Sequence, residues 1–292
     1  TEVEEPVLSE MPDGGIMLYS DLADTFDRLE STGSRLEMTS ILADFLRTAD
    51  KSELRSIVYL SQGKLHPDFV PGVLGMADRL VMKAIAKASG NPEDKVEKLT
   101  VETGDLGQVA ETLISKKKQM ALFSEELTVA RVVKGLATIE GAEGKDSQDI
   151  KQKTLAGLLH DSNPVEARYL CRTVTGRMRV GAADMTILDA LAEAFASKED
   201  RPTIERAFNV TCDIGLVAET IANGGMDAVR AIGVKVGSPG HARREAPVHS
   251  RSRGEDGGPV RHGVQVRRDQ GPGPHWEGLR EAVLQEARGP HI

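Results

Sequence analysis

Aromatic residues, cysteine and long apolar runs are all scarce in this chain of 292 residues. With one Trp, three Tyr and six Phe, the core must come from Leu, Ile, Val, Ala and Met, a composition that favours packed helices over a β-sandwich. Cys171 and Cys212 stand alone without a CxxC pair, so we expect buried thiols of a reduced protein rather than a disulfide or metal site. No apolar run reaches about 18 residues and no signal peptide is visible, which predicts a cytoplasmic protein without membrane contact.

The formal net charge of -8 argues against a protein whose whole surface is basic. A local basic face remains compatible with nucleic-acid binding, because affinity depends on the contact face. His66 and His160 are isolated, and the sequence has no H-E-x-x-H motif or Cys/His cluster. No spacing supports a Ser-His-Asp or Cys-His arrangement. We therefore expect no catalytic residue and no metal ligand upstream of residue 238.

The chain divides into three segments that differ in composition and in the spacing of apolar residues. Residues 1–16 are acidic and lack periodicity, and we expect them to be disordered, with Met17 as the natural start. Residues 17–237 show apolar residues at helical spacing, such as Leu36, Ile41, Leu42 and Phe45, and predict an all-α domain of about a dozen helices. Residues 238–292 hold five of the seven His, nine Arg and no Lys, and we expect a disordered tail.

Two helix starts carry capping signals. Asp50 precedes Glu53 by three residues, which fits a capping box. Asn163 is followed by Pro164 and Glu166, which fit an N-cap, a first helical position and a capping carboxylate. The helix that follows should bury one face, made of Ala167, Leu170, Cys171 and Val174.

Two distant segments of the chain have similar sequences. Residues 105–113 and 213–221 share the pattern D-[LI]-G-x-V-A-E-T-[LI]. A duplicated helical half explains the agreement, and two helix starts with similar capping needs explain it equally simply.

Two loops carry candidate binding residues. Thr175–Gly181 combines Gly176 and Gly181, which allow close backbone approach, with Arg177 and Arg179, which could bind phosphates. Its alternative is a helix–helix turn with solvated arginines. Residues 141–153 enter a helix with Gly144, Lys145 and Ser147 at its start, where free amides and lysines could hold a phosphate. Its alternative is a solvated helix start; the G-x-x-x-x-G-K-[ST] pattern is absent.

Several segments together resemble the N-terminal domain of archaeal ATP-dependent DNA ligases. The resemblance covers about residues 17–237, and its most specific part is Glu166–Leu170 followed by Gly176–Gly181. Further matching segments are 17–46, 58–65, 82–85 and 104–107.

The resemblance implies an all-α domain that grips nicked duplex DNA through the backbone and minor groove, independently of base sequence. It implies backbone contacts at Gly176, Arg177, Arg179 and Gly181, and a phosphate-binding helix start at Gly144, Lys145 and Ser147. In the family, ATP and Mg²⁺ serve nick sealing through a lysine–AMP adduct during replication, repair and recombination, and a sliding clamp is a possible partner. Other functions left open are a helical protein-interaction scaffold without DNA affinity, and an enzyme with an unrecognised site in the tail.

The tail departs from the family where the adenylation lysine is expected. We hypothesise a single frameshift near residues 237–241. Back-translation of residues 241–247, 261–269 and 281–291 in one shifted frame is compatible with three ligase elements in family order, the second a Lys-x-Asp-Gly motif. The chain as written would then bind DNA but lack the nucleophile and bind no ATP or Mg²⁺.

Overall fold

The computed structural model describes residues 17–70, 72, 74–116 and 125–233. Over these residues the chain forms twelve α-helices and one short 3-10 helix, with a single isolated β-bridge, so the all-α prediction is confirmed. The helices are α1 (Tyr19–Glu30), α2 (Arg35–Thr48), α3 (Leu54–Ser61), α4 (Asp78–Ser89), α5 (Glu93–Thr103), α6 (Leu106–Ser115), α7 (Val129–Glu140), α8 (Ser147–Asp161), α9 (Pro164–Val174), α10 (Asp184–Phe195), η1 (Lys198–Asp200), α11 (Arg201–Thr211) and α12 (Ile214–Ala231). The expected disorder at 1–16 and the expected tail at 238–292 lie outside the described residues.

The start of α9 follows the sequence prediction. The Asn163 side chain accepts the Glu166 amide at 2.9 Å, and the Glu166 carboxylate accepts the Asn163 amide at 2.6 Å, with Pro164 as the first helical residue. This reciprocal pair satisfies two amides that the helix itself leaves without partners. The predicted face of α9 is fully buried in the core.

The predicted capping box at Asp50 is wrong. Glu53 is itself the N-cap of α3, and neither residue caps the helix with its side chain. Asp50 instead accepts the Ser52 amide at 2.8 Å, a local turn that competes with capping. One burial prediction also needs correction: Cys212 is only partly buried, whereas Cys171 is buried as expected.

The helices form two repeats of six, α1–α6 and α7–α12. Within each repeat the packing is similar: α1 contacts α2 as α7 contacts α8, and α5 contacts α6 as α11 contacts α12. Between repeats the partners are exchanged, because α4 packs on α8 while α10 packs on α2, and α6 packs on α9 while α12 packs on α3. Of the two explanations left open for the repeated D-[LI]-G motif, this order supports a duplicated half.

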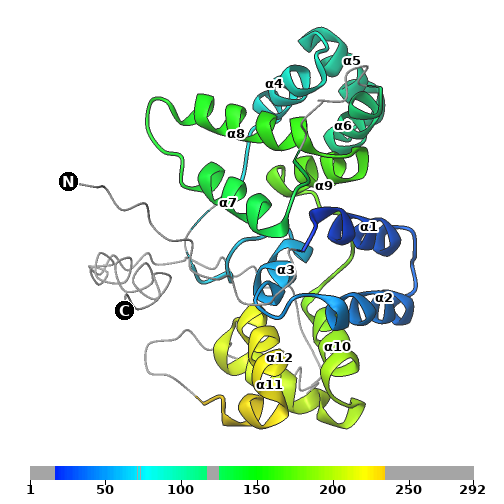
Figure 1. The fold of residues 1–292 in the computed structure, drawn as a ribbon, viewed down its shortest axis with the longest axis vertical. Helices are drawn as coiled ribbons and strands as arrows, with labels where there is room; N and C mark the ends of the chain where they lie inside the picture. Colours follow the sequence, from blue (N-terminus) through cyan, green and yellow to red (C-terminus); the bar gives the residue numbers. More distant parts are fainter. Residues whose placement is uncertain (1–16, 71, 73, 117–124, 234–292) are drawn as a thin grey trace, which may run out of the picture. The chain divides into compact units, whose positions relative to one another are not determined.

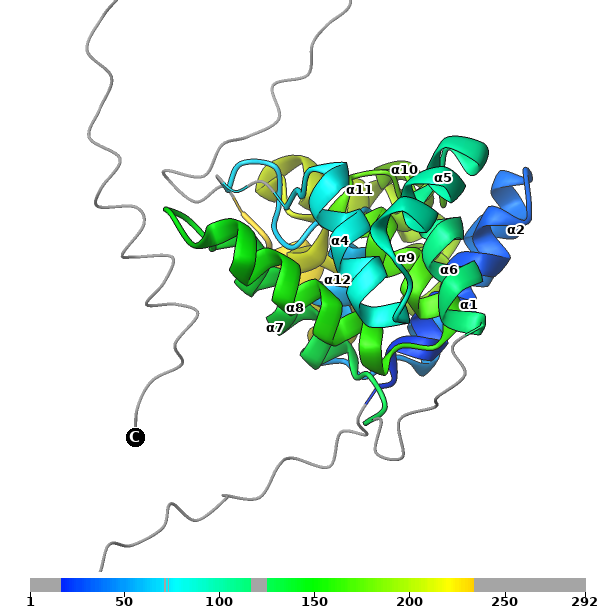
Figure 2. The ribbon, with the colours of Figure 1, turned by 90° about the horizontal axis from the view of Figure 1, so that it is seen from above.

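The exchange is visible in the ribbon. In Figure 1, α4–α6 lie beside α8 and α9, and α10–α12 lie beside α2 and α3. Figure 2, seen from above, shows α4 alongside α8 and α6 next to α9. The repeats meet at the bridge between Leu18 and Thr128, where the Tyr19 amide donates to Leu127 and the Val129 amide donates to Met17. Among the described helices, none is long and apolar enough to span a membrane.

Candidate nucleic-acid interface

The turn after α9 is built by the way that helix ends. Thr175 is the C-cap and Gly176 follows with a φ of +66°. The Gly176 amide donates to the Thr173 carbonyl at 3.1 Å, and the Arg177 amide donates to the Arg172 carbonyl at 2.8 Å. This pair of bonds is a Schellman motif, which places a left-handed residue, usually Gly, just past the helix. Gly176 is thus required by backbone conformation.

Side chains alternate in direction along the turn. Met178 is 8% exposed and Val180 is 2% exposed, so both anchor the segment in the core. Arg177 and Arg179 alternate with these anchors along the chain, and their side chains are 52% and 53% exposed. Arg179 has a φ of +58°, which a side chain with a Cβ rarely adopts. The anchored neighbours hold this strained conformation and present both guanidinium groups on the surface.

Each arginine of the turn contacts a carboxylate at the start of another helix. Arg177 lies 3.2 Å from Asp78, the first residue of α4, and both side chains are about half exposed. Arg179 lies 3.3 Å from Asp105, the buried N-cap of α6. The alternative raised from the sequence, a helix–helix turn with solvated arginines, stays open, because both side chains are about half exposed beside their carboxylate partners. Both pairs leave guanidinium surface open to a further anion.

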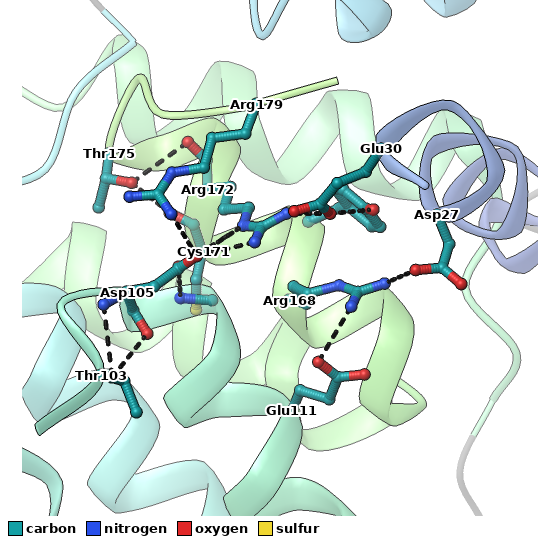
Figure 3. Close-up of polar contacts among 12 residues, drawn as sticks. Asp27, Glu30, Thr103, Asp105, Glu111, Arg168, Cys171, Arg172, Thr175 and Arg179 are labelled. Atoms are coloured by element: carbon teal, nitrogen blue, oxygen red, sulfur yellow. Dashed lines mark hydrogen bonds and ion pairs between the residues drawn. The ribbon is translucent and has the colours of Figure 1, made fainter. Parts of the chain in front are cut away.

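Behind Arg179 lies a buried polar network that joins three helices (Figure 3). Arg172 of α9 is 1% exposed and contacts Asp105 at 2.7 Å and Glu30 of α1 at 2.5 Å. Asp105 is also the N-cap of α6, where its side chain accepts the Gly107 amide at 2.8 Å. A buried charge is tolerated only when it is paired and hydrogen-bonded, and Arg172 meets both conditions.

This network perturbs two carboxyl groups in the same direction. Burial raises the pKa of Asp105, but the hydrogen bond and charge of Arg172 and the Gly107 amide outweigh it, so its pKa lies below the usual 3.8. Burial also raises the pKa of Glu30, and hydrogen bonds from Arg172 and Tyr169 outweigh it there. Both groups are therefore carboxylates at neutral pH. Arg172 neutralises the charge of Asp105 whether or not Arg179 also contacts it.

The second candidate loop joins α7 to α8. Gly144 has a φ of +81°, Lys145 is exposed, and Ser147 is the first residue of α8. Asp146, the N-cap of α8, makes no side-chain capping bond. The Ser147 amide donates to the Gly144 carbonyl at 3.3 Å, so the loop offers Lys145 beside a helix start that has no side-chain cap.

The two loops lie at different places in the fold, and the segment between α3 and α4 reaches both. In Figure 1 the α7–α8 loop extends to the side of the molecule, away from the end of α9. The Met76 amide donates to Val174 at 2.8 Å beside the glycine turn, and His66 lies 2.9 Å from Glu140 at the end of α7. The structure therefore does not bring the predicted residues into one cluster. Sequence reasoning missed Asp78 and Asp105, although the repeated motif had marked Asp105.

In the part of the chain that the structure describes, no group of three or more His, Cys, Asp or Glu side chains could hold a metal ion. What the arrangement offers is two half-exposed guanidinium groups on a turn that Met178 and Val180 anchor.

Known proteins match most of this part of the chain. The family model described as DNA ligase N terminus matches residues 18–192. The chain is 43% identical over 224 residues to a DNA ligase of Cenarchaeum symbiosum, covering 76% of this chain and 38% of that protein. It is 45% identical over 233 residues to DNA ligase 2 of Thermofilum pendens, covering 77% and 39%.

A third relative gives the same coverage. A DNA ligase of Aeropyrum pernix is 42% identical over 237 residues, covering 76% of this chain and 39% of that protein. The chain spans about two fifths of the length of the curated relatives it matches. On the family match and these identities, the chain belongs to the DNA ligase family, of which it carries the N-terminal domain.

Proposed function

We propose that this chain grips nicked double-stranded DNA through its sugar–phosphate backbone and minor groove, as the DNA-binding part of an ATP-dependent ligase that acts in replication, repair and recombination. The observation that carries the proposal is the turn after α9. Two half-exposed arginines alternate with two buried anchors, and each has a guanidinium group available for phosphate. Gly176 and Gly181, both with positive φ, give the turn its shape.

Backbone contacts suit an enzyme that must act at any base sequence. Phosphates carry no base information, and positive groups bind them by releasing condensed counter-ions. Arginine binds phosphate with a planar fork of donors, which gives orientation as well as charge. The net charge of -8 does not oppose such binding, because the acidic residues are distributed over the whole chain.

The α7–α8 loop supplies a second contact in this proposal. Lys145 would approach a phosphate as a point charge, while the helix start at Ser147 adds its amides and the positive end of its dipole. Gly144 allows the left-handed turn that leads into the helix.

Binding of the full chain to a labelled nicked duplex, measured over a series of salt concentrations, tests the proposal. Affinity should fall steeply with salt and not depend on base sequence. Arg177→Gln and Arg179→Gln should each reduce the slope of log affinity against log salt by about one, since each removes about one phosphate contact. Salt-independent binding, or none, would contradict the proposal.

A helical protein-interaction scaffold is the alternative function. It predicts a protein partner and no affinity for DNA, so the same titration separates the two. We propose a sliding clamp as a protein partner of the parent ligase, on the basis of the family alone.

Nick sealing itself we assign to the parent enzyme. ATP and Mg²⁺ would act there on a lysine beyond the N-terminal domain, where Mg²⁺ neutralises phosphate charge. We propose that residues 238–292 are read out of frame, so that this chain forms no lysine–AMP. Their Arg- and His-rich composition without lysine supports the frameshift. Labelled ATP should leave the chain unlabelled, and an intact gene frame across codons 237–241 would contradict the frameshift.

A further inference from the structure

The glycine turn after α9 has a structural counterpart after α3. Gly63 follows that helix with a φ of +71°, close to the +66° of Gly176. Its amide donates to Leu60 at 2.9 Å, and the Lys64 amide donates to Tyr59 at 2.9 Å, which repeats the Schellman bonds of the first turn. The sequences agree in type: Gly-Lys-Leu-His here, and Gly-Arg-Met-Arg after α9.

The side chains of the two turns also alternate alike. Leu65 is 9% exposed and Met178 is 8% exposed, so each turn has its apolar anchor at the same position. Lys64 is 38% exposed, at the position of Arg177, and is held 2.5 Å from Asp68 as Arg177 is held by Asp78. His66 is 45% exposed, at the position of Arg179.

The support behind the turn is duplicated as well. Asp213 caps α12 by accepting the Leu216 amide at 2.8 Å, as Asp105 caps α6. Asp213 accepts the Tyr59 hydroxyl at 2.5 Å, so Tyr59 of α3 takes the place that Arg172 takes in α9. The equivalence therefore extends from the turn through the helix before it to the helix start that it packs against.

An approximate two-fold axis relates these elements. The exchanged helix partners and the bridge of Leu18 with Thr128 are what such an axis requires, because the bridge joins equivalent residues of the two repeats. The two turns lie against each other: a Cβ added at Gly63 would lie 2.7 Å from Cγ of Met178. The charged residues beside this contact, Lys64 and Arg177, are both partly exposed.

We propose that Lys64, assisted by His66, binds a phosphodiester of duplex DNA on the strand opposite to the one held by Arg177 and Arg179. The inference rests on the proposed function. A duplex has a local dyad that exchanges its strands, so a protein with two-fold symmetry places equivalent groups on phosphates of opposite strands. The duplex must displace Asp68 from Lys64, as it displaces Asp78 from Arg177.

The second turn should bind more weakly than the first. Lysine is a strongly hydrated point charge, whereas arginine offers a fixed fork to a phosphate. His66 lies 2.9 Å from Glu140, so that carboxylate competes with a phosphate for its ring nitrogen.

The first arm of the test compares variants of the full chain on a labelled nicked duplex. Lys64→Gln removes the charge and leaves a polar side chain that is one atom shorter. It should weaken binding about fivefold to tenfold at 0.1 M salt and reduce the salt slope by about one. Lys95→Gln is the matched control, because Lys95 is an exposed lysine that contacts Asn91 four residues earlier, and it should bind as wild type does. Circular dichroism melts confirm that both variants fold.

The second arm locates the contact on the DNA. Single phosphates are replaced by uncharged methylphosphonates, one strand at a time. The phosphate that Lys64 contacts is the one whose replacement weakens binding by the wild-type chain but does not weaken binding by Lys64→Gln any further. This phosphate should lie in the strand opposite to the one identified in the same way with Arg177→Gln. Wild-type affinity for Lys64→Gln, or both positions in one strand, would overturn the inference while Arg177→Gln still supports the proposed function. Absence of salt-dependent binding by wild type would overturn both.

Discussion

Asp105 serves three structural purposes at once. It caps α6 through the Gly107 amide, neutralises the buried Arg172, and contacts the exposed Arg179. The buried pair involves full charges in a poorly solvated place, so removal of one partner leaves the other uncompensated. Arg179 depends on Asp105 for its orientation, whereas Asp105 does not depend on Arg179.

Asp105→Asn should lower the free energy of unfolding by about 3 kcal/mol at neutral pH, because it leaves Arg172 with Glu30 alone. The pKa of Asp105 is lower in the folded state than the usual 3.8. Its contribution to the free energy of unfolding is therefore complete above about pH 3.8, and it is lost as the pH falls through the pKa of the folded state. The difference between wild type and variant should thus shrink below about pH 4. Urea denaturation at several pH values measures it.

Asp44→Asn is the control for that experiment. Asp44 contacts Arg47 on the surface of α2 at 2.5 Å, and an exposed pair of this kind contributes at most about 1 kcal/mol. A difference for Asp105→Asn that matches the control, or that stays constant down to pH 3, would contradict the role given to Asp105.

At the scale of helices, the sequence predicted those features that depend on residues close together in the chain. The cap of α9 and its buried face follow from residues within one helix, and both were predicted. The pairing of Arg172 with Asp105 joins residues 67 positions apart, and no periodicity reveals it. Leu36 shares the helical spacing of Ile41, Leu42 and Phe45 but is 84% exposed, because spacing alone does not say which helical turn lies beyond the neighbouring helix. The two loops were predicted from composition, but their separation in space was not.

Close contact between α6 and α9 depends on a glycine that periodicity does not explain. A Cβ at Gly107 would lie 2.7 Å from the Arg168 carbonyl oxygen and 2.9 Å from Cγ of Arg172. Gly215 occupies the equivalent place in α12, where a Cβ would lie 2.6 Å from the Tyr59 ring. Both repeats thus use glycine to bring a helix start against its partner helix.

Gly107→Ala should destabilise the domain by about 1–3 kcal/mol, because the backbone oxygen it would meet cannot move away as a side chain can. Gly157→Ala is the opposite case: Gly157 lies within α8 with no atom near its Cβ position. That change should stabilise the domain by about 0.5–1 kcal/mol, through the higher helix propensity of alanine. Thermal melts of the two variants should move in opposite directions, and equal shifts would contradict the packing described for α6.

In the described part of the whole chain, neither repeat contains its own complete core. Helices α4 and α6 bury their apolar faces against α8 and α9, and α10 and α12 bury theirs against α2 and α3. Each repeat therefore supplies half of two packing units, which couples the stability of the first to that of the second.

A chain divided between α6 and α7 should consequently give two pieces that do not fold separately. Each piece would expose the faces that the other covers, and apolar burial is the main stabilising term in folding. Mixed together, the pieces should recover helicity and a single cooperative melt, measured by circular dichroism. A cooperative melt of the N-terminal piece alone would show that the exchange of helices is not essential for its stability.

The exchange of helices also bears on how the protein is made. As the chain leaves the ribosome from its N-terminus, α4 and α6 are complete long before α8 and α9, their partners, have been translated. Val109 and Leu113, which are 1% exposed in the finished fold, must remain uncovered for that interval. Nascent chains with uncovered apolar surface are those that aggregate or engage chaperones, so stalled or truncated synthesis of this protein should be far more hazardous than that of a chain whose first half folds independently.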